Sequence, residues 1–118
     1  MKHLLIFIAI AFTIPPFLYS QNYTEVALQN GVVGTCGTCS FGAGVSFVDF
    51  NADGLDDLTF ATEDGQNILF YQNTGSGFQL LTAPVNNFGE TKQILWVDFD
   101  NDGDKDLFAT CDGCPDLL

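Results

Sequence analysis

The sequence predicts an all-β fold made of repeated four-stranded antiparallel sheets, and three observations lead to this prediction. Short β-branched and aromatic runs alternate with turns rich in Gly, Asn and Asp, about every 8 to 12 residues. No stretch after residue 20 shows the sustained apolar period of about 3.6 residues that marks an amphipathic helix. The segment 45–58 aligns without gaps with 94–107, at an offset of 49 residues. A fixed period of about 50 residues indicates a repeat architecture.

The first repeat, about residues 44–84, is expected to contain four short strands. They are predicted at 44–50, 58–62, 67–72 and 78–82. Four strands in roughly 40 to 50 residues is the sequence pattern of one β-propeller blade. The alternative is a small β-sandwich whose two acidic loops happen to look alike.

The second repeat, about residues 93–118, is incomplete. It supplies one strand, an acidic loop and a second strand, and residues 115–118 then occupy the place where the third strand of the first repeat opens. Residues 21–118 are therefore interpreted as a partial propeller of about one and a half blades. The remaining blades are expected elsewhere in a longer parent chain, so this part alone is predicted to be marginally stable, dependent on calcium and prone to associate.

Residues 1–20 have the features of a secretory signal peptide. Lys2 precedes an apolar run, Leu4–Ile14, and Ser20 precedes a polar chain. The alternative is a membrane anchor, but a run of this length, ended by Pro15 and Pro16, is too short to span about 30 Å of hydrocarbon. The protein is therefore predicted to be secreted or displayed at the cell surface, without membrane insertion.

The charge balance excludes several functions. The chain has 15 Asp and Glu residues against 3 Lys and Arg, a formal net charge of −12. Nucleic-acid binding requires basic side chains that replace phosphate counterions, so it is excluded. The single histidine, His3, lies in the leader, which removes Ser-His-Asp and Cys-His catalysis from the exported part.

Two acidic loops follow the pattern D-x-[DN]-x-D-G-x-x-D, at residues 49–57 and 98–106. Oxygen ligands at positions 1, 3, 5 and 9, with the carbonyl at position 7, suit a hard cation that takes 6 to 8 oxygens. The predicted calcium ligands of the first loop are Asp49, Asn51, Asp53, Asp57 and the carbonyl of Leu55. Those of the second loop are Asp98, Asp100, Asp102, Asp106 and the carbonyl of Asp104.

Other interpretations of these loops are weaker. An EF-hand needs a bidentate Glu at position 12 between two helices, whereas Phe60 and Ala109 stand there and the flanks are β-like. Mg²⁺ is disfavoured because it demands small octahedral geometry and keeps several waters. A solvated acidic turn explains one such loop more readily than two in register.

The residues around both loops resemble the FG-GAP/VCBS repeat of integrin α-subunit propellers and many secreted bacterial proteins. Phe47–Leu58 and its partner around Trp96 carry the resemblance. Residues 23–27, 31–32 and 69–75 are similar to the cartilage-acidic-protein-like subgroup. The resemblance covers about residues 23–118, and the second repeat is interpreted as truncated. It implies a propeller blade with Ca²⁺ in the loop that joins its first two strands.

The four cysteines form two CxxC pairs, Cys36–Cys39 and Cys111–Cys114. In an exported chain an even number of cysteines favours disulfides over a zinc site or a redox site. Residues 60–66 align with 108–114, which places the second pair on either side of an Asp-Gly turn, about 5.5 Å apart across a hairpin. Pairing between the two CxxC units remains an alternative.

The sequence favours a calcium-stabilised extracellular module for binding or adhesion, and no enzyme. Its partner is expected to be an extracellular protein or a glycan that the sequence does not identify. The alternative function is a non-catalytic accessory region of a secreted polysaccharide-active enzyme. Tyr23, Tyr71 and Trp96 could form a sugar platform, but Trp96 aligns with Phe47 in a predicted inner strand, which favours a role in core packing.

Overall fold

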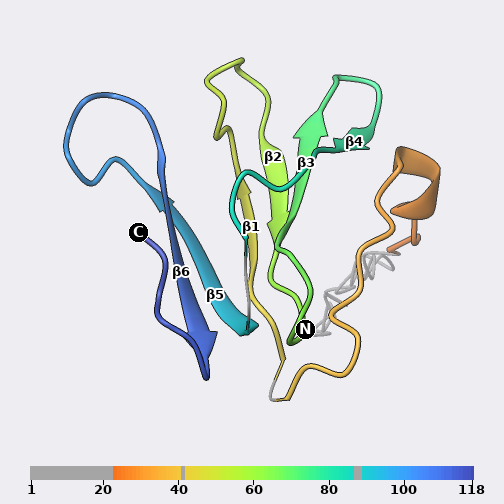
Figure 1. The fold of residues 1–118 in the computed structure, drawn as a ribbon. Coiled ribbons are helices and arrows are strands. Elements are labelled where there is room, and N and C mark those ends of the chain that lie inside the picture. Colours follow the sequence, from red (N-terminus) through yellow and green to blue (C-terminus); the bar gives the residue numbers. More distant parts are fainter. Residues whose placement is uncertain (1–22, 41, 87–88) are drawn as a thin grey trace, which may run out of the picture.

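The computed structural model describes residues 23–40, 42–86 and 89–118. The predicted signal peptide lies outside these residues. The described chain contains one short 3-10 helix and six strands (Figure 1). These elements are η1 (Leu28–Asn30), β1 (Val45–Val48), β2 (Asp57–Phe60), β3 (Leu69–Asn73), β4 (Phe78–Leu80), β5 (Glu90–Val97) and β6 (Asp106–Asp112).

The strands form one four-stranded sheet in the order β1-β2-β3-β4 and one two-stranded sheet, β5-β6. All strand pairs within these sheets are antiparallel. The all-β prediction and the extent of about one and a half blades are confirmed. The predicted first strand is shortened at its end, because Asp49 and Phe50 already belong to the acidic loop.

The core lies between the two sheets. Ile94 of β5 and Ala109 of β6 pack with Phe70 of β3 and with Ala61 and Ile68, which lie just after β2 and just before β3. These five side chains are almost completely buried, which excludes water from the junction.

Trp96 of β5 is the largest side chain at this junction. Its ring stacks on Phe50, with centroids 5.0 Å apart, and meets Phe70 edge-on at 6.2 Å. Its indole N–H donates a hydrogen bond to the hydroxyl of Thr59, at 3.1 Å. The predicted core role of Trp96 is confirmed, and the buried Tyr71 is likewise unavailable as part of a sugar platform.

The segment before β1 lies on the opposite side of the four-stranded sheet from β5 and β6 (Figure 1). The N–H of Val33 donates to the Tyr71 hydroxyl at 3.3 Å, and Gly34 lies against the side chains of Phe60 and Leu69. Residues 23–40 therefore contact β2 and β3, the two inner strands of this sheet, on that side.

Both acidic loops project from the same end of the molecule (Figure 1). This follows from the pairing, because each loop joins two adjacent antiparallel strands, β1 to β2 and β5 to β6. Gly44, the residue just before β1, lets the backbone of β5 approach closely: a Cβ there would lie 3.0 Å from the Lys92 carbonyl oxygen. The two sheets are consequently held side by side.

The turn after β6 resembles the turn after β2, but the chain reaches it one residue sooner after the matched strand position. Gly65 and Gly113 both adopt a left-handed conformation, with φ of 77° and 80°. However, Val45 pairs with Phe60 and Ile94 pairs with Ala109, so Ala109 takes the place of Phe60. The sequence alignment of 60–66 with 108–114 therefore holds for the turn, and it is wrong by one residue in the strand.

Leu117 forms an isolated antiparallel bridge with Ala109, through two backbone hydrogen bonds of 3.1 and 2.9 Å. Phe60 pairs with Leu69 of β3 in the first repeat. Leu117 thus stands where a third strand begins, as the sequence predicts.

The cysteines pair within each CxxC unit, Cys36 with Cys39 and Cys111 with Cys114. The Cα atoms of the second pair are 5.4 Å apart, in agreement with the predicted hairpin geometry. Gly89 lies against both sulfur atoms of this disulfide and has no room for a side chain.

Candidate calcium-binding loops

The two acidic loops share one backbone path. Ala52 and Asn101, at position 4 of each loop, have φ of 60° and 62°. Gly54 and Gly103, at position 6, have φ of 89° and 101°. These left-handed residues reverse the chain twice and turn the side chains at odd positions inward.

The first loop is held by its own side chains. Asp49 accepts hydrogen bonds from the N–H groups of Asp53 and Gly54, at 3.1 and 2.8 Å. Asn51 accepts a second bond from the Asp53 N–H at 2.9 Å, and Asp53 accepts one from the Leu55 N–H at 2.9 Å. Short polar side chains at positions 1, 3 and 5 therefore hold the turn through hydrogen bonds within the loop.

The second loop repeats these bonds position by position. Asp98 accepts from the N–H groups of Asp102 and Gly103, both at 3.1 Å. Asp100 accepts from the Asp102 N–H at 3.2 Å, and Asp102 accepts from the Asp104 N–H at 3.1 Å. The spacing of the motif thus dictates the same scaffold twice.

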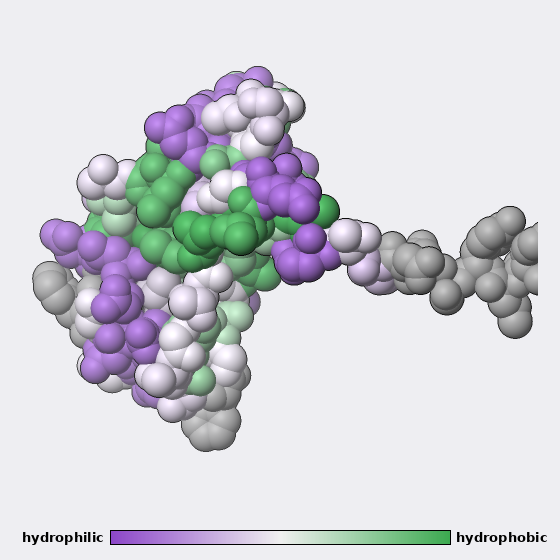
Figure 2. Space-filling model, turned by 90° about the vertical axis from the view of Figure 1, so that its right-hand side faces the viewer, coloured by the Kyte–Doolittle hydropathy of each residue, from purple (hydrophilic) through white to green (hydrophobic). Residues whose placement is uncertain are grey.

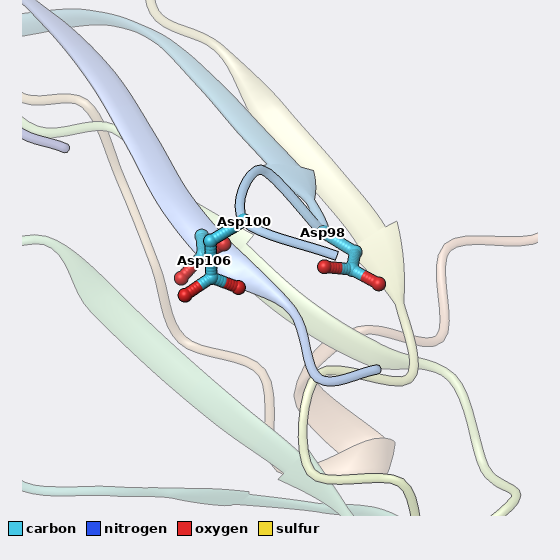
Figure 3. A group of neighbouring side chains, drawn as sticks. All are labelled: Asp98, Asp100 and Asp106. Atoms are coloured by element: carbon cyan, nitrogen blue, oxygen red, sulfur yellow. The ribbon is translucent and has the colours of Figure 1, made fainter. Parts of the chain in front are cut away.

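Three carboxylates of the second loop converge. One oxygen each of Asp98, Asp100 and Asp106 lie within 4.8 Å of one another (Figure 3). Asp98 follows β5, Asp106 begins β6 and Asp100 lies in the loop between them. Carboxylate oxygens are the ligands that Ca²⁺ prefers, so this donor set fits a hard divalent cation.

The remaining predicted ligands do not form such a close group of carboxylates. Asp102 lies outside this group of three. In the first loop Asp49, Asp53 and Asp57 form no comparable group of three acidic residues within the part of the chain that the structure describes. Asn51 occupies the position of Asp100, so an amide oxygen takes the place of the third carboxylate there.

The last ligand of each loop differs in burial. Asp57 is completely buried, and its two oxygens accept bonds from the N–H groups of Phe50, at 3.3 Å, and Asn73, at 2.8 Å. Asp106 is half-buried and accepts one such bond, from the Phe99 N–H at 2.8 Å. A buried carboxylate is costly unless hydrogen bonds or a cation compensate it, so Asp57 also fits a cation site.

The protonation of the loop acids follows from these bonds. The N–H of Leu55 lowers the pKa of Asp53, and the N–H of Asp104 lowers the pKa of Asp102. A hydrogen bond to Asp102, together with repulsion by that carboxylate, raises the pKa of Asp104. Asp53 and Asp102 therefore remain ionised, as metal ligands must be.

Two residues of β3 support the first loop although the motif does not include them. The amide of Gln72 donates to Asp53 at 3.4 Å, and the amide of Asn73 donates to the carbonyl oxygen of Asp56 at 3.0 Å. The signal for these contacts is topological: because β3 runs antiparallel to β2, its last residues lie beside the start of β2.

A hollow of about 480 Å³ separates the two loops. Val48–Ala52 and Asp56 line it on one side, and Gly103–Lys105 line it on the other. The acidic loops of neighbouring sheets therefore face each other across this hollow, and Lys105 of the second loop is the one basic residue among those that line it.

The sheets and loops together define a class of protein, one built from repeated antiparallel β-sheets that each carry an acidic loop between their first two strands. The family model of the FG-GAP-like repeat matches residues 49–109, which is more than half of the chain. The chain belongs to this family, whose repeats indicate a β-propeller-like extracellular module. A search of curated proteins and a search of solved structures gave no match.

No helix among the described residues is long and apolar enough to cross a membrane.

Proposed function

We propose that this chain is a secreted, calcium-binding repeat module that serves extracellular binding or adhesion within a β-propeller. The observation that carries this proposal is the convergence of Asp98, Asp100 and Asp106 within 4.8 Å. The same hydrogen-bonded scaffold in the first loop supports a second site. Ca²⁺ would be held by both loops and would offset the repulsion among their carboxylates.

Calcium is proposed to act here as a structural ion. Each loop joins two strands, so an ion bound to Asp98 and Asp106 would fix the end of β5 against the start of β6. If the calcium concentration is about a hundred times the dissociation constant of a site, binding adds about 2.7 kcal/mol to the stability of the folded state.

An extracellular location agrees with two disulfides, because such bonds persist in oxidising compartments. A non-catalytic role agrees with the arrangement of the acids. The clustered carboxylates are engaged in loop hydrogen bonds, and the family's repeats are generally binding or structural modules.

Calorimetric titration of the exported chain with CaCl₂ tests the proposal. Two binding events are expected for the natural sequence, and one for the variant Asp98→Ala. Asp64→Asn is the matched control, because this exposed acid lies in a turn outside both loops. The absence of binding heat with the natural chain, or unchanged binding in Asp98→Ala, would contradict the proposal.

A further inference from the structure

The end of β3 contacts the first acidic loop at three points. The backbone N–H of Asn73 donates a hydrogen bond to the carboxylate of Asp57 at 2.8 Å. The side-chain amide of Asn73 donates to the carbonyl oxygen of Asp56 at 3.0 Å. The side-chain amide of Gln72 donates to the carboxylate of Asp53 at 3.4 Å. Two adjacent residues of one strand therefore reach positions 5, 8 and 9 of the motif.

Two of these contacts end on predicted calcium ligands. Asp53 and Asp57 each accept one hydrogen bond from β3 and a second one from a backbone N–H of their own loop. An ionised carboxylate has about four lone-pair positions, so both residues keep lone pairs for a cation. Hydrogen bonds from outside the ligand set fix the orientation of the ligands, and their removal lowers metal affinity by about 10- to 100-fold. Gln72 and Asn73 stand in this outer position around the first loop.

Residues 73–77, which we call the β3–β4 turn, are closed by local hydrogen bonds. The side-chain oxygen of Asn73 accepts the N–H of Gly75 at 2.9 Å, so one amide group both begins the turn and donates to the loop. The N–H of Thr74 donates to the carbonyl oxygen of Gly77 at 2.8 Å. Leu55 of the loop lies against Gly75. A support whose own conformation is fixed places ligands more accurately than a flexible one.

The segment that contains η1 lies against this turn on the other side from the first loop (Figure 1). A Cβ on Gly77 would lie 3.1 Å from the carbonyl oxygen of Asn30. A Cβ on Gly31 would overlap the carbonyl oxygen of Phe78, the first residue of β4. The backbones are therefore in direct contact, and the β3–β4 turn lies between η1 and the first loop.

The contact between η1 and the β3–β4 turn involves little buried side-chain surface. No side chain of η1 is buried, and Leu28 of η1 and Leu80 of β4 are exposed. Figure 2 shows the side of the molecule on which these elements lie, where hydrophobic surface is bounded by hydrophilic residues. Elements with few buried apolar contacts open at a low cost in free energy. Hydrogen exchange of the backbone N–H groups near η1 is therefore a sensitive measure of how firmly the turn is held.

We propose that Gln72 and Asn73 are positioning residues of the first calcium site, and that calcium binding there is coupled to the order of the β3–β4 turn. This inference rests on the proposed function, because the first loop must bind Ca²⁺. With Asp53 and Asp57 fixed by an ion, the strand end that donates to them would be fixed as well. Coupling between two equilibria is reciprocal, so a turn that strengthens calcium binding is stabilised by calcium to the same extent.

Calorimetric titration with CaCl₂ in an Asp98→Ala background tests the positioning role, because the second site is removed there. Asn73→Ala should weaken calcium binding at the first site by about tenfold. Gln72→Met keeps the length of the side chain and removes its amide donor, and it should weaken binding by about threefold. Gln79→Met is the matched control, because this exposed glutamine of β4 pairs with Gln72 and lies outside both loops. It should bind calcium like the background chain.

Two further measurements distinguish positioning from a loss of stability alone. A purely structural role of Asn73 would lower the free energy of unfolding in urea equally with chelator and with calcium. A positioning role makes the loss larger in calcium, by the amount that corresponds to the tenfold change in affinity. In hydrogen exchange, CaCl₂ should slow the N–H groups of Gly75 and Val32 in the natural chain, and it should slow them less in Asn73→Ala.

The outcomes separate this inference from the proposed function. If the Asp98→Ala chain shows no binding heat, the first loop is not a calcium site and both are contradicted there. If this chain binds calcium and Asn73→Ala and Gln72→Met bind it equally well, the inference alone is overturned. Equal loss of stability with chelator and with calcium overturns it too. Should Asn73→Ala fail to fold, the affinity of Gln72→Met relative to Gln79→Met decides.

Discussion

The two acidic loops have the same backbone and the same internal hydrogen bonds, but they are fixed to their surroundings differently. Asp57 ends the first loop inside the protein and accepts bonds from two backbone N–H groups, one of them in β3. Asp106 ends the second loop half-exposed, with one such bond. The first loop is therefore fixed by the protein, whereas the proposed calcium ion would contribute more to fixing the second.

The largest expected effect concerns this difference in anchoring. Asp57→Ala should reduce the free energy of unfolding by about 3 kcal/mol, because two part-buried N–H groups lose their acceptor. Asp106→Ala should cost about 1 kcal/mol without calcium, since one partly exposed bond is lost. Urea denaturation with and without a chelator measures both, with the exposed Asp56→Ala as control. Equal losses in the chelator would show that burial does not separate the two loops.

The next effect concerns the turns that follow the two loops. The second turn is closed by the disulfide between Cys111 and Cys114, whereas Glu63 of the first turn binds Thr38. Replacing both cysteines by serine should cost about 2 kcal/mol, the value expected for so short a closed loop.

Thermal melting of this double variant measures the loss. Alkylation and mass spectrometry of the exported chain, before and after reduction, should show that all four thiols are protected and that zinc is absent. Four freely alkylated cysteines, or stoichiometric zinc, would contradict the disulfide assignment.

The calcium affinity of each loop should depend on the residue at position 3 of the motif. The second loop is expected to bind more tightly, because Asp100 stands where the first loop has Asn51. Asp100→Asn should weaken the second site by about tenfold, and Asn51→Asp should strengthen the first by a similar factor. Calorimetric titration of the two variants with CaCl₂ measures these changes in affinity. If the ranking of the two sites does not change, position 3 is not what distinguishes them.

The smallest effect is the pH dependence contributed by Glu63. The hydroxyl and the N–H of Thr38 donate to this carboxylate and lower its pKa below the ordinary value of 4.5. The stabilisation is therefore complete above pH 4.5 and is lost as the pH falls through the lower folded-state pKa. Glu63→Gln should be less stable than the natural chain at neutral pH, and the difference should shrink in acid. A difference that persists at low pH would mean that the contact is independent of charge.

The sequence predicted the parts of the fold that depend on local chemistry. The strands, the paired loops and the disulfide across the second turn follow from residue types and spacing. The burial of Asp57 and its bond to Asn73 could not be predicted, because they depend on where β3 lies relative to β2. The difference in burial between Trp96 and Phe47 could not be predicted either. Both residues occupy the same position of the repeat, and they differ because only Trp96 has a preceding sheet to pack against.

The position of Trp96 provides an optical probe of one junction. It is the only tryptophan in the chain, and it lies between the two sheets, against Phe50 and the hydroxyl of Thr59. Its emission should therefore shift to longer wavelength when β5 and β6 separate from the four-stranded sheet, even while that sheet stays intact. Comparing this signal with the far-ultraviolet circular dichroism of the strands would distinguish local undocking from global unfolding in a single protein without an added label.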